Sequence, residues 1–159
     1  MSTFTLIFSF GFAPKGVAAP LKQGRLLLRD TSLDSTKAIW SATSSVAGKQ
    51  YAESFHERGG LIPPAYRLKK GGDWRVSTTP IPMTSTKGVE GNFYKIDPHA
   101  VVTDRGGERS DFGVHLDANV PGSMGCIVMD KKNFAEFESM MKSLAKANVK
   151  QVPLVVIYS

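Results

Sequence analysis

The sequence is poor in cysteine and histidine, with one cysteine and three histidines in 159 residues. The single Cys126 excludes a disulfide within the chain, so its thiol is structural, reactive or intermolecular. Because the histidines are only His56, His99 and His115, few side chains qualify as a general base near neutral pH. No apolar run reaches the roughly 18 residues that span a bilayer. We therefore expect no transmembrane segment.

Acidic residues are also scarce, with 14 Asp and Glu against 20 Lys and Arg and a formal net charge of +6. A basic surface attracts polyanions, such as nucleic acid, anionic cell wall or a membrane surface. Nucleic-acid binding is supported by this charge alone, because no helix-turn-helix, zinc-finger or RNA-binding signature accompanies it. No Lys or Arg precedes Lys15, which makes the N-terminus a weak match to a secretory signal.

Alternating apolar residues at the N-terminus place Phe4, Leu6, Phe8 and Phe10 on one face of a strand. Pro80 and Pro82 predict a loop or a sheet edge. Further short strands are expected, at 24–29, 37–43, 66–68, 92–96, 111–116 and 126–129.

One helix is expected from about 131 to 148, with Asp130 or Asn133 as its N-cap. Residues 152–158 then form a buried final strand. We find no repeat and no linker. The sequence therefore predicts one mainly β domain over 1–159, with one major C-terminal helix followed by a last strand. The apolar positions at helical spacing are Phe134, Phe137, Met141 and Leu144.

The stretch from Arg109 to Val128 carries the most chemical information. A strand delivers His115, and a short loop returns through Ser123-Met-Gly to Cys126, eleven positions later. A neighbouring imidazole can hold a thiol as a thiolate–imidazolium pair, so we expect the Cys126 pKa to lie well below the usual value of about 8.5. Gly125, without a side chain, would admit a substrate carbonyl, and the N–H groups of Gly125 and Cys126 could form an oxyanion hole.

Several neighbouring residues have two interpretations each. Cys126 and His115 can also be a structural thiol and a core histidine. Arg109 can bind a substrate carboxylate bidentately or form a structural ion pair. Asp117 and Asn119 can orient His115 or shape the turn, and Ser123 can support the loop by hydrogen bonding.

A zinc site built from His99, Asp104, His115 and Asp117 is a further alternative. No helix carries two of these residues at ligand spacing. We therefore predict neither a metal nor another cofactor.

The order of His115, loop and Ser123-x-Gly-Cys126 resembles the active-site motif of the L,D-transpeptidase (YkuD-type) family. The segment 60–66 resembles the proline-rich turn of that family, and 24–44 resembles its opening hairpin. Arg109 before 111–115 resembles an arginine found in a compact branch that includes secreted antibacterial effectors. The resemblance covers about residues 22 to 158.

The resemblance implies a β-sandwich or barrel, with Cys126 as nucleophile, His115 as base and the Gly125 and Cys126 amides as oxyanion hole. It departs from the family at Met124, where most members carry a second histidine beside the substrate. The loop between His115 and Cys126 is shorter than usual, as in the compact branch, and the proline turn lacks a glycine and is one residue short.

The function implied is acyl transfer or hydrolysis on peptidoglycan peptide stems through a Cys126 thioester. The alternative is a non-catalytic wall-binding module of the same fold. Such a protein acts at the cell wall, in the periplasm or outside the cell. With its weak signal sequence, we expect delivery by a phage or a secretion system.

Overall fold

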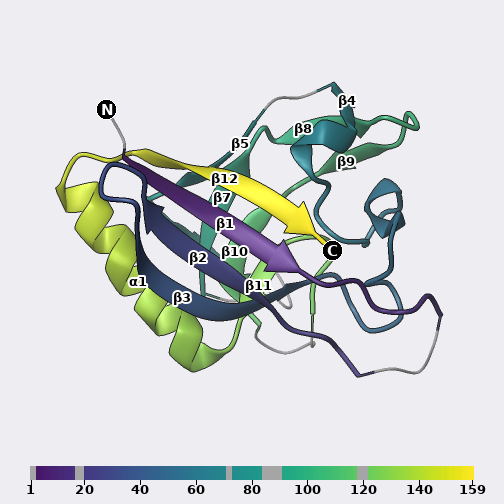
Figure 1. The fold of residues 1–159 in the computed structure, drawn as a ribbon, viewed down its shortest axis with the longest axis horizontal. Helices are drawn as coiled ribbons and strands as arrows, with labels where there is room; N and C mark the ends of the chain where they lie inside the picture. The colour runs from purple at the N-terminus through teal and green to yellow at the C-terminus, as the bar shows by residue number, and fades with distance from the viewer. Residues whose placement is uncertain (1–2, 17–19, 71–72, 84–90, 118–121) are drawn as a thin grey trace.

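The computed structural model describes residues 3–16, 20–70, 73–83, 91–117 and 122–159 (Figure 1). The protein is mainly β, with one α-helix near the C-terminus and a strand after it, as predicted. The elements are β1 (Phe4–Phe10), β2 (Gly24–Asp30), β3 (Ser35–Ser44), η1 (Ser54–His56), η2 (Ala65–Arg67), β4 (Leu68–Lys70), β5 (Trp74–Ser77), β6 (Ile81–Met83), β7 (Gly91–Asp97), β8 (Ala100–Thr103), β9 (Glu108–Ser110), β10 (Gly113–Leu116), β11 (Ile127–Met129), α1 (Lys131–Lys146) and β12 (Gln151–Tyr158).

Within the described residues, eight strands close into a barrel in the order β10-β11-β3-β2-β1-β12-β5-β7. The ring closes because β7 pairs with β10 as well as with β5. Strand β6 adds to β7 as an edge, where Pro82 costs no essential ladder bond. The remaining strands, β4, β8 and β9, form a small separate sheet, seen in Figure 1 beside the barrel.

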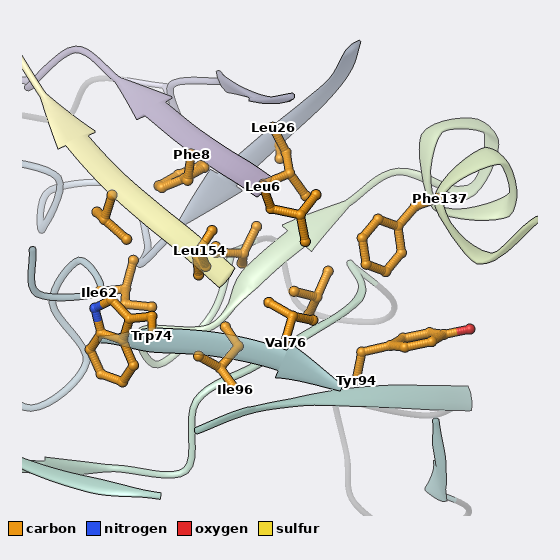
Figure 2. Packing of buried hydrophobic residues seen from close by; sticks show 14 of the residues in the cluster. Leu6, Phe8, Leu26, Ile62, Trp74, Val76, Tyr94, Ile96, Phe137 and Leu154 are labelled. Atoms are coloured by element: carbon orange, nitrogen blue, oxygen red, sulfur yellow. The ribbon is translucent and has the colours of Figure 1, made fainter. Parts of the chain in front are cut away.

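The barrel interior is the hydrophobic core, and the N-terminal alternation predicts its lining correctly. Leu6, Phe8 and Phe10 are buried, while Phe4 packs partly buried at the margin. Figure 2 shows Leu6 and Leu154, from the parallel pair β1 and β12, among the buried side chains of this core. Burial of this kind contributes about 25 cal/mol per Å² of apolar surface, so the core is the main source of stability.

Helix α1 packs its apolar stripe against the barrel, and its predicted face is confirmed. The Asp130 carboxylate caps the helix by accepting the Asn133 N–H at 2.8 Å. The Phe137 ring meets the rings of Trp40 and Tyr94 edge-on at centroid distances of 5.4 and 5.2 Å. Met141 is fully buried, which makes it core packing. No helix in the described part of the chain is long and apolar enough to cross a membrane.

Three local predictions are wrong. Residues 65–67 form a 3-10 turn, closed by the Arg67 N–H on the Pro64 carbonyl at 3.0 Å, where we expected extended chain. Strands β10 and β11 begin one or two residues later than predicted. They do so because Asp111 and Gly125 have φ angles of 65° and 109°, outside the extended range.

Candidate active site

Strand β10 carries His115, and Cys126 lies directly before the neighbouring strand β11. The two strands are parallel, with His115 opposite Val128, and Cys126 lies two residues before Val128. Because side chains alternate along a strand, we infer that Cys126, one residue before β11, lies on the side of the sheet that carries His115. The approach of base and thiol stays a prediction, and no direct hydrogen bond joins the two side chains among the described residues.

The Cys126 thiol is buried, with 9% of the residue exposed. Its S–H donates to the Asp111 carbonyl, with Sγ 3.4 Å from the oxygen. Burial raises the pKa of Cys126 to about 12, against the opposing effects of the Gly113 N–H and the Arg109 charge. The expectation of a resting thiolate is therefore wrong. The unreacted protein holds a neutral thiol, because desolvation outweighs the groups that favour the anion.

His115 is buried as a neutral imidazole of defined tautomer. Nδ1 lies 2.8 Å from the Leu116 carbonyl oxygen, which can only accept, so the ring proton is on Nδ1. Burial lowers the pKa of His115, partly offset by this hydrogen bond and by Asp117. Nε2 then carries the lone pair of the ring. A neutral histidine in this tautomer is suited to accept a proton.

Phe93 and Gly113 shape the wall beside the imidazole, and the sequence interpretation missed both. The Phe93 ring stacks on His115, with centroids 5.9 Å apart. It also lies over Gly113, where an added Cβ would sit 2.1 Å from the Phe93 Cζ. A glycine inside a strand pattern is a known signal of such close approach, so Gly113 could have been singled out from the sequence. Nothing comparable marks Phe93.

Asp111 is a third residue that the sequence interpretation missed. It adopts a φ of 65°, rare for a residue other than glycine. Its N–H donates to the His99 carbonyl at 3.1 Å, and its own carbonyl accepts the Cys126 S–H. Strained backbone of this kind concentrates at functional sites. Here it aims a carbonyl at the thiol.

Arg109 lies inside the protein rather than at the substrate side of the thiol. Its residue is 5% exposed. Nη1 donates to the carbonyls of Phe55 and Leu61 at 2.6 and 3.2 Å, and Nη2 donates to the Gly60 carbonyl at 3.1 Å. The predicted carboxylate clamp does not fit this geometry, because both terminal nitrogens are committed to the protein's own backbone.

Gly125 makes way for Arg109, not for a substrate carbonyl as we expected. A Cβ on Gly125 would lie 2.4 Å from Arg109 Nη2. The Gly125 carbonyl accepts the Ser44 hydroxyl at 3.2 Å, which fixes the peptide just before Cys126. The missing side chain therefore lets a guanidinium pack beneath the Cys126 loop.

Replacing Gly125 with alanine is expected to destabilise the protein by more than the about 1–3 kcal/mol typical of backbone strain, because the new methyl group also displaces Arg109. Gly106→Ala is the matched control, since Gly106 has a φ of 89° and nothing within 4 Å of an added Cβ. Urea unfolding measures both. Equal losses in the two variants would show that the contact between Gly125 and Arg109 is unimportant.

Ser123 supports the loop, as the sequence predicts. Its hydroxyl donates to the Cys126 carbonyl at 2.6 Å and accepts the Ser45 N–H at 3.2 Å. Its N–H donates to the Ser45 carbonyl at 2.8 Å. The loop before the thiol is thus tied to the end of β3.

Asp117 bonds to the loop, and its charge also raises the pKa of His115, so both of its predicted roles stay open. Its carboxylate accepts the Gly122 N–H at 3.1 Å, and burial raises its pKa. Asn119 lies outside the described residues. Met124 is 62% exposed, within contact distance of Gly59, so it is an apolar surface two residues before the thiol.

The alternative zinc site is not assembled. His99 pairs with Asp111 at 3.4 Å, while Asp104 pairs with Arg67 and His56. No group of three or more metal-binding side chains occurs among the residues that the structure describes.

No protein-family model, curated protein or solved structure matches this chain. The functional assignment therefore depends on the chemistry of its own residues.

Proposed function

We propose that this chain is a cysteine enzyme of L,D-transpeptidase type, which transfers or hydrolyses acyl groups on peptidoglycan peptide stems. The observation that supports the proposal is the parallel pairing of β10 with β11, which places His115 opposite Val128, two residues after Cys126, with the His115 Nδ1 proton anchored on the Leu116 carbonyl. A neutral base and a neutral thiol on neighbouring strands are the two groups that an acyl-enzyme reaction needs.

The raised pKa of Cys126 decides how the thiol would react. With a pKa of about 12, forming the free thiolate at pH 7 would cost about 7 kcal/mol at 1.36 kcal/mol per unit. When the proton moves to His115 Nε2 as the C–S bond forms, the reaction does not pass through the free thiolate. The proposed enzyme therefore uses general-base catalysis and not a stored ion pair.

In the proposed first step, Cys126 Sγ attacks a stem-peptide carbonyl while its proton moves to His115 Nε2. The negative charge passes to the carbonyl oxygen, near the amides of Gly125 and Cys126. The C–N bond then breaks, and the leaving amine takes the proton from His115. The product is a thioester on Cys126.

In the second step, His115 removes a proton from the acceptor as it attacks the thioester carbonyl. The C–S bond breaks, and the thiol regains its proton. An amine acceptor gives a cross-link or an exchanged residue, whereas water gives hydrolysis. The same two side chains serve both outcomes.

The mainly β barrel with a C-terminal helix and a final strand is compatible with the L,D-transpeptidase fold, and the short loop before Cys126 favours the compact, effector-like branch. The proposed place of action is the cell wall, reached by phage or secretion-system delivery. A surface of net charge +6 suits an anionic wall.

A wall-binding module without catalysis is the second candidate, and the burial of Cys126 favours it. The two candidates differ in one result. Incubation with purified muropeptides, followed by mass analysis, gives cross-linked or shortened products from the enzyme and unchanged muropeptides from the module. The proposal also predicts the same products in the presence of a metal chelator.

A further inference from the structure

Arg109 is a buried cation whose hydrogen bonds, in the part of the chain that the structure describes, go to backbone carbonyls. Among the described residues no carboxylate pairs with its guanidinium, which is held by three backbone carbonyls. Burial lowers the pKa of Arg109 to about 10, so the group remains charged at neutral pH. An unpaired buried charge costs several kcal/mol. A buried charge with a strongly shifted pKa is a candidate for a functional role.

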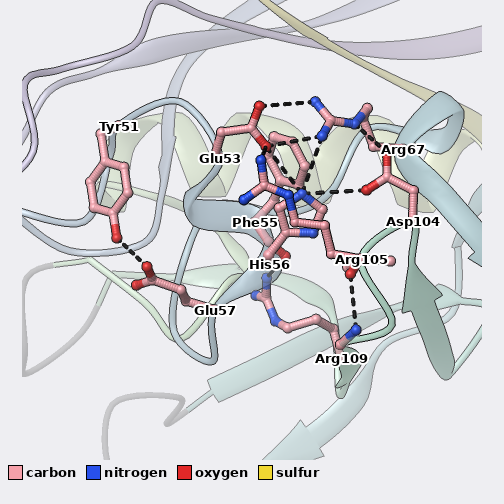
Figure 3. Close-up of polar contacts among 11 residues, drawn as sticks. Tyr51, Glu53, Phe55, His56, Glu57, Arg67, Asp104, Arg105 and Arg109 are labelled. Carbon is pink, nitrogen blue, oxygen red and sulfur yellow. Dashed lines mark hydrogen bonds and ion pairs between the residues drawn. The ribbon is translucent and has the colours of Figure 1, made fainter.

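The carbonyls come from residues 55–61, and ion pairs of Glu53 hold the start of this segment in place (Figure 3). Glu53 precedes η1 with a φ of 73°. Its carboxylate accepts both Arg67 Nη groups, at 3.2 and 2.9 Å, and lies 3.1 Å from His56 Nε2. This network fixes η1, whose Phe55 carbonyl binds Arg109 at 2.6 Å. The orientation of the guanidinium is therefore set from outside the Cys126 loop.

On its other side, the guanidinium packs against the peptide that precedes the thiol. Nη2 occupies the space where a Gly125 side chain would be. Two ionisable groups feel the Arg109 charge, Cys126 and Tyr158. Tyr158 donates its hydroxyl to the Ile62 carbonyl and is kept neutral, because burial raises its pKa far above the usual value. Cys126 is then the group whose reaction can supply the missing negative charge.

We propose that Arg109 is a positioning residue that stabilises negative charge at Cys126, as that charge develops when the thiol is deprotonated. The buried Arg109 guanidinium lowers the free energy of the Cys126 thiolate, because the thiolate is the anionic partner that the guanidinium lacks among the described residues of the resting protein. The inference rests on the proposed role of Cys126 as nucleophile. It does not depend on peptidoglycan as the substrate.

The first test is the rate of Cys126 alkylation by iodoacetamide between pH 7 and pH 10. Arg109→Met is expected to slow alkylation about 10-fold or more at a given pH, the change that one pKa unit produces. Arg109→Lys keeps the charge and should recover part of the rate. A purely structural Arg109 predicts the opposite, because loosening the loop exposes the thiol and speeds the reaction. Equal or faster alkylation in a folded Arg109→Met variant would therefore overturn the proposal.

Arg67→Met is the matched control, because it removes an equal charge from the network that holds η1 and leaves the Arg109 charge in place. It is expected to slow alkylation less than Arg109→Met does. An equal effect of the two variants would assign the result to loop geometry and contradict the proposal.

A second test uses the unchanged sequence, in case Arg109→Met does not fold. Iodoacetate and iodoacetamide leave adducts of nearly equal size on Cys126, and only the first carries a negative charge. The carboxymethyl protein, made with iodoacetate, should have a higher thermal midpoint than the carbamidomethyl protein, made with iodoacetamide. The reason is that the added carboxylate provides an anionic partner for Arg109. An equal or lower midpoint would contradict the proposal. Neither test uses muropeptides, so the failure of this inference is distinguishable from the failure of the proposed function.

Discussion

Replacing Cys126 with alanine is expected to abolish muropeptide turnover while leaving the barrel folded. The acyl-enzyme route has no other thiol to use, since the chain contains one cysteine. Loss of a nucleophile typically lowers turnover by about four to six orders of magnitude. The stability cost should be about 1 kcal/mol, because the variant loses one weak S–H hydrogen bond to Asp111 and leaves a small cavity. Mass analysis of products measures the first effect, and urea unfolding measures the second.

Cys126→Ser is the companion variant. A hydroxyl keeps a donor toward the Asp111 carbonyl, so its stability should lie close to that of the parent protein, and turnover should still be lost. Full turnover in the alanine variant would show that Cys126 is not the nucleophile and would end the proposed mechanism.

Replacing His115 with glutamine is expected to lower turnover about 100- to 10,000-fold, the usual contribution of a positioned general base. Glutamine can replace the hydrogen bond to the Leu116 carbonyl but cannot take the thiol proton. In the parent protein, turnover should fall as pH drops through the His115 pKa, which burial holds below 6.5. The glutamine variant should lack that acid limb. The measurement is the pH profile of product formation, with His99→Gln as the control for an exposed histidine.

The same substitution gives a pH signature in stability. Because the folded-state pKa of His115 is lowered, the unfolded chain binds more protons than the folded one below about pH 6.5, and the free energy of unfolding falls as pH decreases there. The fall should be smaller in His115→Gln. Identical pH profiles for turnover and for stability in the two proteins would mean that His115 is neither buried neutral nor the base.

Individual strands and the helix could be predicted where the pattern was local, whereas the order of the strands in the barrel was not predicted. Alternation along β1 and helical spacing along α1 are written in consecutive residues, so their buried faces were predicted correctly. Strands β8 and β9 have four and three residues, too few for a periodic signal. The parallel pairing of β1 with β12 joins opposite ends of the chain, and no local pattern encodes it.

At the candidate site too, local spacing was informative, whereas the effects of residues distant in the sequence were not predicted. The short spacing of His115 and Cys126 favours neighbouring strands, and β10 and β11 do pair. The ionisation of the thiol was predicted with the wrong sign, because it depends on burial and on groups such as Asp111 and Arg109 around it. Gly125 shows the cause most directly. An absent side chain leaves a space, and the sequence does not say whether a substrate or a distant arginine fills it.

The central claim is a thioester on Cys126, and the intact mass of the protein after brief incubation with muropeptides and an acid quench tests it most directly. The account predicts a mass increase equal to the acyl part of the stem peptide, mapped to the peptide containing Cys126 and absent from the alanine variant. Muropeptides that are converted while Cys126 never gains mass, or that are bound without any adduct or product, would contradict it.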